Sequence, residues 1–263
     1  MSNTRIERDS MGELQVPSEA LYGAQTQRAV NNFPISQLRM PRQFVRALLL
    51  AKAAAAQANL ELKQISEGQS KAIVTACNEL LASDFMAHFP VDVFQTGSGT
   101  STNMNANEVI ATLASRALGE PVNANDHVNC GQSSNDIIPT TIHVSAALAI
   151  HEQLLPALAH LVQVTEQKAS QVHPFVKTGR THLMDAMPVR LSQVLNGWSQ
   201  QIKANVEHIE NLLPSLQALA QGGRLGKLRM LVDAGQIAAD DPFVIDGLGE
   251  TALVVLAQLE DDE

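Results

Sequence analysis

The chain has 263 residues, and hydrophobic residues make up 45% of it, which is enough to bury a sizeable core in one or two domains. Its formal net charge is −9 and it contains no run of Lys and Arg, so composition argues against nucleic acid as a partner. Cys77 and Cys130 are too few for a disulfide framework. We therefore expect a protein of a reducing compartment, the cytoplasm.

No membrane partner is expected. The first ten residues are polar and mixed in charge, which is not the pattern of a signal peptide. The most hydrophobic stretch, residues 47–60, carries Lys52, Gln57 and Asn59, and it is shorter than the roughly 20 apolar residues of a membrane span. Aromatic residues make up only 3% of the chain, while Ala and Leu are frequent. The expected fold class is mainly α, because strands favour β-branched and aromatic residues.

The first part of the chain divides into an arm and two helices. Residues 1–40 lack a sustained periodicity and contain several Gly and Pro residues, so we expect an extended arm with short turns. Ser66 and Gln69 have the spacing of a capping box at a helix start. The two helices are expected at residues 44–62 and 71–81.

Polar loops separate the later helices. A loop at residues 95–102 precedes a helix at 104–118, which Gly119 and Pro121 should end, and a second loop occupies residues 123–136.

Two long helices are predicted at residues 140–172 and 191–219, joined by a loop at 172–188, and Pro156 should kink the first or mark a join. Two such helices form an antiparallel hairpin that belongs in a bundle. They cannot cover their apolar stripes alone, so we expect partner helices from another subunit or from further chain.

Three loops gather small polar residues beside long helices. The first contains Gly97, Ser98, Gly99 and Thr100: the glycines allow close backbone approach, the hydroxyls can donate hydrogen bonds, and the next helix start offers unpaired N–H groups. This combination suits an anion such as a carboxylate. A flexible loop that caps its own helix has the same composition, and the Gly-Lys-Ser/Thr ending of a phosphate-binding loop is missing.

The other two loops also have alternative explanations. Ser133, Ser134 and Asn135 are good helix caps, so a plain helix start explains them in isolation. The third loop, residues 177–185, places cations, an imidazole and a carboxylate close together, namely Lys177, Arg180, His182 and Asp185. A His with a pKa near neutrality is the natural proton carrier, although a surface loop with scattered charges is the alternative.

Five stretches together carry a specific resemblance: residues 22–28 (Tyr-Gly-Ala-Gln-Thr-Gln-Arg), 95–108, 125–129 (Asn-Asp-His-Val-Asn), 132–136 (Gln-Ser-Ser-Asn-Asp) and 179–188 (Gly-Arg-Thr-His-Leu-Met-Asp-Ala-Met-Pro). With them the chain resembles class II fumarate hydratase, of the fumarase/aspartase superfamily, from about residue 5 to residue 223. Aspartate ammonia-lyase is the less similar alternative, because that family usually has Gly-Ala-Gly-Thr in the first loop and Gln at the position of His182.

The resemblance implies an N-terminal lyase domain at residues 1–139 and the first long helices of a central bundle at residues 140–223. It implies reversible hydration of fumarate to (S)-malate with no metal or organic cofactor. It also implies a homotetramer in which each active site combines three subunits. Residues 224–263 lie beyond the resemblance and are interpreted as a helical tail of unknown role.

Single residues inherit roles from the same resemblance. His182 matches the proton donor and acceptor that acts on the water or hydroxyl. Residues that match positions binding the substrate carboxylates or the reacting water are Ser98, Gly99, Thr100, Ser133, Ser134, Asn135 and Thr181. Asn129 lies just before the second loop, and we expect it to support the geometry of that loop.

The sequence departs from the family in two places. A second dicarboxylate site would comprise Asn123, Ala124, Asn125 and Asp126, with Asn123 where the family commonly has His. Family members also continue for about as much chain again and carry a loop Gly-Ser-Ser-x-Met-Pro-x-Lys-x-Asn, whose Ser is the usual carbon-acid base; these 263 residues do not contain it. We expect weak or absent hydration by this chain alone. The alternative is a non-catalytic relative that acts as a binding or oligomerisation module, or an inactive fragment.

Overall fold

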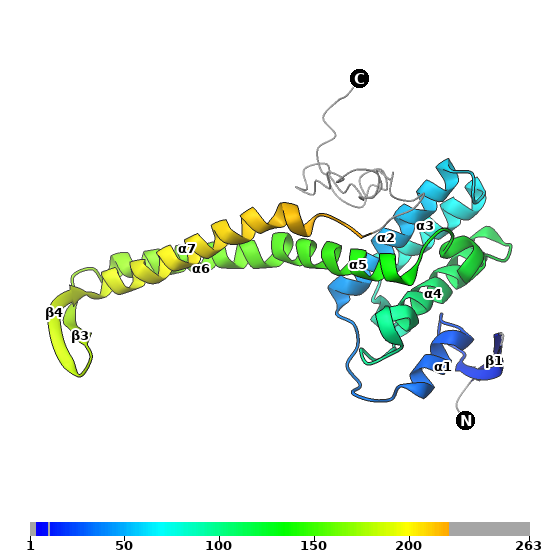
Figure 1. Ribbon diagram of the computed structural model, residues 1–263, viewed down its shortest axis with the longest axis horizontal. Helices are drawn as coiled ribbons and strands as arrows, with labels where there is room; N and C mark the ends of the chain where they lie inside the picture. Colours follow the sequence, from blue (N-terminus) through cyan, green and yellow to red (C-terminus); the bar gives the residue numbers. More distant parts are fainter. Residues whose placement is uncertain (1–3, 10, 221–263) are drawn as a thin grey trace, which may run out of the picture. The chain divides into compact units, whose positions relative to one another are not determined.

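The computed structural model describes residues 4–9 and 11–220, and these residues are mainly helical, as predicted (Figure 1). The described residues form two compact units: the residues up to 146 together with 216–220, and residues 147–215. The predicted helical tail at residues 224–263 lies outside the described residues.

The N-terminal residues are more ordered than the predicted extended arm. Strand β1 (Thr4–Asp9) pairs antiparallel with β2 (Gly12–Pro17), and helix α1 (Ala24–Asn32) follows. The prediction missed all three elements. The guanidinium of Arg5 donates to the carbonyl oxygens of Ala20 at 2.6 Å and Tyr22 at 2.8 Å, so a long-range contact holds the segment between β2 and α1. Local periodicity carries no trace of such a contact.

Three helices build the core of the first unit: α2 (Arg42–Glu61), α3 (Glu67–Leu81) and α4 (Thr100–Leu118). The capping box is confirmed, because the Ser66 hydroxyl accepts the Gln69 N–H at 3.2 Å and the Gln69 side chain accepts the Ser66 N–H at 2.9 Å. Gly119 ends α4 with φ +78°, also as predicted. Helix α4 begins at Thr100, earlier than periodicity indicated, so the end of the polar loop is its first turn.

Short helical turns connect these elements. The 3₁₀ turns η1 (Phe85–His88) and η2 (Gly97–Gly99) precede α4, and the π-helical turn η3 (Ala124–Val128) follows it. The core consists largely of Leu, Ile, Val and Ala side chains of α2, α3 and α4. Lys52 lies in the middle of α2 and is fully buried.

The first long helix runs from Ser134 to Gln171 as α5 (Ser134–Ala149), the π-helical turn η4 (Ile150–Leu154) and α6 (Leu155–Gln171). The join predicted at Pro156 is present, because η4 ends just before the first turn of α6, where this proline lies. By length and composition the helix could cross a membrane, a test that the core helix of a bundle also passes. Its most apolar window is only 17% buried.

The second unit holds a hairpin that the sequence did not predict. Strands β3 (Val176–Thr181) and β4 (Met184–Arg190) pair antiparallel, where a loop at residues 172–188 was expected. Almost every side chain of both strands is exposed. A hairpin without a buried face has no alternation of apolar and polar residues, and that alternation is the main strand signal in a sequence.

The predicted antiparallel helix pair is confirmed for α6 and α7 (Leu191–Leu216), which run side by side (Figure 1). The Glu166 carboxylate accepts the Ser199 hydroxyl at 2.8 Å and pairs with the Lys203 ammonium at 2.7 Å, while His173 contacts Ser192 nearer the hairpin. Large apolar side chains remain exposed on the two helices: Leu161, Val164, Trp198 and Leu212.

Candidate functional site

The first candidate loop reaches the N-terminus of α4 through a left-handed glycine. Gly99 has φ +68°, and a Cβ atom there would lie 3.1 Å from Cγ2 of Ile138 in α5. Only glycine fits both the conformation and the space. Thr100 is therefore placed at the start of α4, close to the first turns of α5. Ser98 lies within η2, and its side chain is not among the described groups.

Gln95 holds this loop from inside. Its side-chain oxygen accepts the Thr102 N–H at 2.8 Å, and its side-chain nitrogen donates to the backbone carbonyl of Asp92 at 2.9 Å. The hydroxyls of Thr96 and Ser101 are 2.9 Å apart. The loop is thus a fixed, hydrogen-bonded helix start rather than a flexible connection. This role of Gln95 was not predicted from the sequence.

The second candidate loop forms the start of α5. The Ser133 hydroxyl accepts the Asn135 N–H at 3.2 Å, so the helix-start explanation of this motif is confirmed. The Ser134 hydroxyl oxygen accepts a hydrogen bond from the Asn103 amide at 3.0 Å, which leaves its proton free to be donated. Asn135 is exposed. Capping and anion binding are therefore compatible here.

A buried ammonium lies behind this loop. Lys52 has an exposed fraction of 0% and donates to the side-chain oxygens of Asn129 at 3.0 Å and Gln132 at 2.8 Å. Desolvation lowers the pKa of Lys52 to about 7. The Asn103 amide donates to the same Asn129 oxygen at 3.2 Å. Asn129 thus supports the loop as expected.

The roles of Lys52, Asn103 and Gln132 were not predicted from the sequence. The one available signal was a lysine in the middle of an Ala- and Leu-rich helix, where a charge is costly unless it serves a purpose.

A cavity of about 450 Å³ opens beside the first loop, with Thr96, Thr100 and Asn125 on its lining. Arg28 and Asp9 also line it and pair with each other at 2.7 Å. The hydrogen bond from Arg28 lowers the pKa of Asp9 and keeps it ionised. The cavity therefore offers neutral hydroxyl and amide donors beside an internally balanced ion pair.

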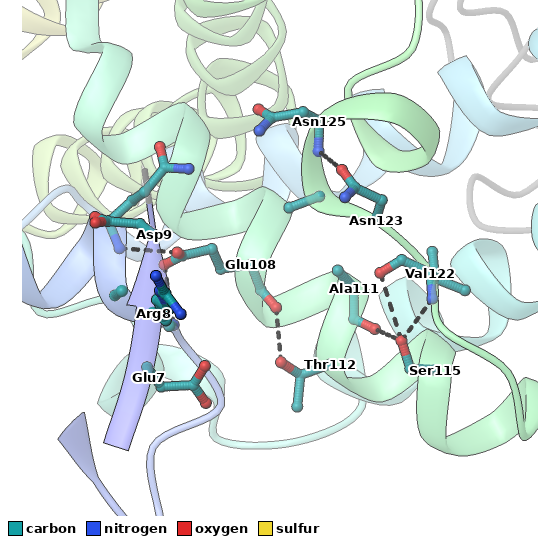
Figure 2. Close-up of a pocket in the computed structure, with 14 residues that line it drawn as sticks. Glu7, Arg8, Asp9, Glu108, Ala111, Thr112, Ser115, Val122, Asn123 and Asn125 are labelled. Atoms are coloured by element: carbon teal, nitrogen blue, oxygen red, sulfur yellow. Dashed lines mark hydrogen bonds between the residues drawn. The ribbon is translucent and has the colours of Figure 1, made fainter. Parts of the chain in front are cut away.

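The second dicarboxylate site has no excess of positive charge. Asn123 caps η3, because its side-chain oxygen accepts the N–H groups of Asn125 at 2.8 Å and Asp126 at 2.9 Å. A cavity of about 530 Å³ is lined there by Asn123, Ala124 and Asn125, and Figure 2 shows Glu7, Asp9 and Glu108 beside the lone guanidinium of Arg8. Glu7 and Asp9 are already paired, with Arg5 and Arg28, each at 2.7 Å. Arg8 and Glu108 are the remaining charges of the lining, so it has no excess of cations to attract a dianion.

Thr181 and His182 belong to the second unit. Thr181 ends β3, His182 begins the turn before β4, and both are exposed. The register shifts between Thr178 and Gly179, and a Cβ atom at Gly179 would overlap the carbonyl oxygen of Met187. The first unit by itself holds the other six predicted substrate-binding residues. In the described part of the chain, no group of three or more His, Cys, Asp or Glu side chains is placed to hold a metal ion.

Comparison with known proteins identifies the family of this chain. The sequence profile of a lyase family matches residues 12–253. The chain belongs to this lyase family. The match extends beyond residue 223, where the resemblance was expected to end.

Within the lyase family, similar relatives include class II fumarate hydratases. The enzyme named fumarate hydratase class II 2 of Pseudomonas aeruginosa is 62% identical, covering 99% of this chain and 60% of its own length. Fumarate hydratase class II of Xylella fastidiosa is 54% identical, covering 85% of this chain and 48% of its own length. The chain thus spans about half, and at most 60%, of the length of these relatives.

Solved structures agree with the lyase fold. The class II fumarase of Schistosoma mansoni superposes with a TM-score of 0.78 at 42% identity, covering 82% of this chain and 47% of that one. A fumarate lyase:delta crystallin from Brucella melitensis gives 0.77 at 39% identity, covering 82% and 52%. The mainly α, fumarase-like fold expected from the motifs is confirmed.

Proposed function

We propose that this chain carries part of the active site of a class II fumarate hydratase, which interconverts fumarate and (S)-malate. The observation that supports this proposal most directly is that two loops at helix N-termini lie close together. Gly99 packs against Ile138, and the Asn103 amide donates a hydrogen bond to the Ser134 hydroxyl. Helix N-termini favour negative charge, and hydroxyl and amide donors suit carboxylates. The fumarate hydratase names of the relatives support the same assignment.

The chemistry defines the task of each residue. In hydration, an oxygen–carbon bond forms at one alkene carbon while a proton is added to the other. We assign the carboxylates of the substrate to donors at Thr100, Ser133, Ser134 and Asn135, with Ser98 and Thr181 as further donors. Fixed neutral donors localise the negative charge that builds up during this reaction.

In this proposal, His182 is the residue that accepts and donates the proton. Imidazole can accept a proton from the attacking water and return it to the departing hydroxyl in the reverse reaction. Its exposed position at the tip of a hairpin suits a group that completes a site built with other chains. No metal or organic cofactor is required by this scheme.

We also propose that the exposed apolar side chains of α6 and α7 pack against further copies. Trp198 and Leu212 are 56% and 60% exposed, and contiguous apolar faces are uncommon on soluble monomers. A homo-oligomer, a tetramer in the family, would cover them. Sedimentation should show self-association, and a stable monomer at high dilution would count against it. A cytoplasmic location, without nucleic acid or membrane partners, stays a prediction.

The 263-residue chain alone should hydrate fumarate far more slowly than a full-length relative. It does not contain the serine-bearing loop. Loss of one general acid/base partner lowers rates by about 10²–10⁴. The remaining donors should still bind a dicarboxylate weakly.

Subunit complementation tests the proposal. A full-length relative with Asn at the position aligned to His182 is mixed with this chain, refolded together, and assayed by fumarate absorbance. We expect activity that neither partner shows alone, since the relative supplies the missing loop and this chain supplies His182. The control is this chain with His182→Asn, which should give no activity in the mixture.

The outcomes separate the alternatives. No activity in mixed oligomers would favour the non-catalytic binding or oligomerisation module. Ammonia release from L-aspartate, without fumarate hydration, would favour aspartate ammonia-lyase. Complementation that survives His182→Asn would show that the assignment of His182 is wrong.

A further inference from the structure

The ammonium of Lys52 is a buried charge with neutral neighbours. Both of its hydrogen-bond acceptors are side-chain amide oxygens, on Asn129 and Gln132. The titratable side chain that faces it is Cys77 of α3. Burial raises the pKa of Cys77 to about 12, so this thiol stays uncharged near neutrality. The groups next to Lys52 on the loop side, Asn129 and Gln132, do not titrate.

A short chain of hydrogen bonds leads from Lys52 to the candidate site. Lys52 and the Asn103 amide donate to the same oxygen of Asn129, at 3.0 Å and 3.2 Å. The Asn103 amide also donates to the Ser134 hydroxyl at 3.0 Å. The Asn103 side-chain oxygen is buried and accepts no hydrogen bond from the described residues. The orientation of Asn103 therefore depends on the two bonds that its nitrogen donates.

Gln132 provides a second hydrogen bond between the Lys52 ammonium and residues 129–132. While its oxygen accepts from Lys52, its amide nitrogen donates to the Val128 carbonyl at 2.9 Å. The Asn129 amide nitrogen donates to the Gln132 carbonyl at 3.2 Å. Lys52 thus fixes both ends of residues 129–132, immediately before Ser133 and Ser134.

We propose that Lys52 is a positioning residue of the candidate site, and that its protonation is coupled to the binding of a dicarboxylate at residues 133–135. The identity of this anion rests on the proposed function. Protonated Lys52 orders the segment that presents Ser134, and it supplies a positive charge behind the anion. Loss of the proton removes that charge and weakens both amide contacts.

Thermodynamic reciprocity makes the coupling measurable. A ligand that binds the protonated form more tightly must raise the pKa of Lys52 when it binds. A dianion bound at residues 133–135 raises the pKa of Lys52 because it supplies the negative charge that the ammonium lacks. If only the protonated form binds, affinity falls about tenfold between pH 6 and pH 8, because the pKa of Lys52 is about 7.

The first experiment measures fumarate affinity of the full chain by calorimetry across this pH range. Wild type is compared with Lys52→Met and with Lys71→Met, which makes the same chemical change on the exposed side of α3. We expect the roughly tenfold fall in wild type and Lys71→Met, and weaker binding without this step in Lys52→Met. Equal affinities and pH profiles for all three would overturn the proposal and leave the proposed function intact.

The second experiment needs no substitution, so a failure of Lys52→Met to fold does not matter. The ¹³Cε resonance of Lys52 and the side-chain amide resonances of Asn103 and Asn129 are titrated in the ligand-free chain. We expect one shared midpoint near pH 7, moved upward by saturating fumarate. Three results would overturn the proposal. They are a Lys52 midpoint near the ordinary pKa of lysine, amide resonances of Asn103 and Asn129 that do not change at the Lys52 midpoint, and a midpoint that bound fumarate does not shift.

The two hypotheses fail in different ways. If wild type binds no dicarboxylate at any pH, the proposed substrate class is wrong, and with it the anion coupling. The positioning of Asn103 and Asn129 by Lys52 is then decided by the ligand-free titration alone.

Discussion

The carboxylate of Glu108 accepts the backbone N–H of Gly23 at 2.9 Å, although the two residues are 85 positions apart. The same carboxylate accepts the N–H groups of Gln25 and Thr26, both at 3.0 Å. Helix α1 lacks a side-chain cap of its own, so a residue of α4 satisfies its first turn. A Cβ atom at Gly23 would lie 2.9 Å from this carboxylate, which explains the glycine.

Glu108→Gln should therefore destabilise the first unit. A neutral amide offers one acceptor oxygen and turns an NH₂ toward other donors, so we expect a loss of about 1–3 kcal/mol in the free energy of unfolding. Urea denaturation measures it. Glu79→Gln, on an exposed position of α3, is the matched control and should stay within about 0.5 kcal/mol of wild type. Equal effects of the two substitutions would contradict the capping role.

The bulge at Gly179 should be intolerant of any side chain. Gly179→Ala places a methyl group against the Met187 carbonyl oxygen, and main chain cannot move aside cheaply. We expect faster amide hydrogen exchange throughout β3 and β4, and loss of complementation through Thr181 and His182. The control is Gly197→Ala, which meets nothing within 4 Å and should stabilise α7 by up to about 1 kcal/mol. Unchanged exchange in Gly179→Ala would disprove the steric argument.

The elements that could be predicted are those whose cause is local. The capping box of Ser66 and Gln69 and the left-handed Gly119 are written in adjacent residues, and both are confirmed. Helix α1 and the β3–β4 hairpin were missed for opposite reasons. The cap of α1 comes from Glu108, far along the chain, and the hairpin buries no face that would impose an alternating pattern.

The residues of the candidate site also divide into those with a local sequence signal and those without one. Gly99 and Thr100 stand in a loop whose composition suits an anion. The types of Ser133 and Ser134 indicated a helix start, and only the family resemblance predicted that they bind substrate. Lys52 acts through Asn129 and Asn103, on three separate segments of the chain. A sequence shows such a residue only as a lysine where a leucine would be expected.

Asp92 should give the first unit an acid-sensitive contact. Desolvation alone would raise the pKa of Asp92, but hydrogen bonds from the N–H groups of Phe94, Ser36 and Gln37 and from the Ser36 hydroxyl outweigh it and lower the pKa to about 2. A lowered pKa means that its stabilisation is present above about pH 4 and is lost as the pH falls toward 2.

Asp92→Asn should therefore lower stability at pH 7 and flatten its decline between pH 4 and pH 2, as followed by thermal unfolding monitored by circular dichroism. The control is Asp84→Asn, whose side chain is 89% exposed in the wild type. An undiminished decline in Asp92→Asn would assign the acid sensitivity to other carboxylates.

The buried ammonium of Lys52 should also leave a signature in stability, independent of any ligand. Its pKa is about 7 in the folded chain against 10.5 for a free lysine, so between these values the unfolded chain binds more protons and stability rises with pH. The difference in unfolding free energy between wild type and Lys52→Met should grow in favour of wild type over that range, by at most about 5 kcal/mol, and should be flat below pH 7. Other titrating groups cancel in this difference. Denaturant titrations from pH 6 to pH 10 measure it, with Lys71→Met as the control whose difference from wild type stays flat. A flat difference for Lys52→Met as well would mean that Lys52 keeps its ordinary pKa, because solvent or a counter-charge reaches it inside the fold.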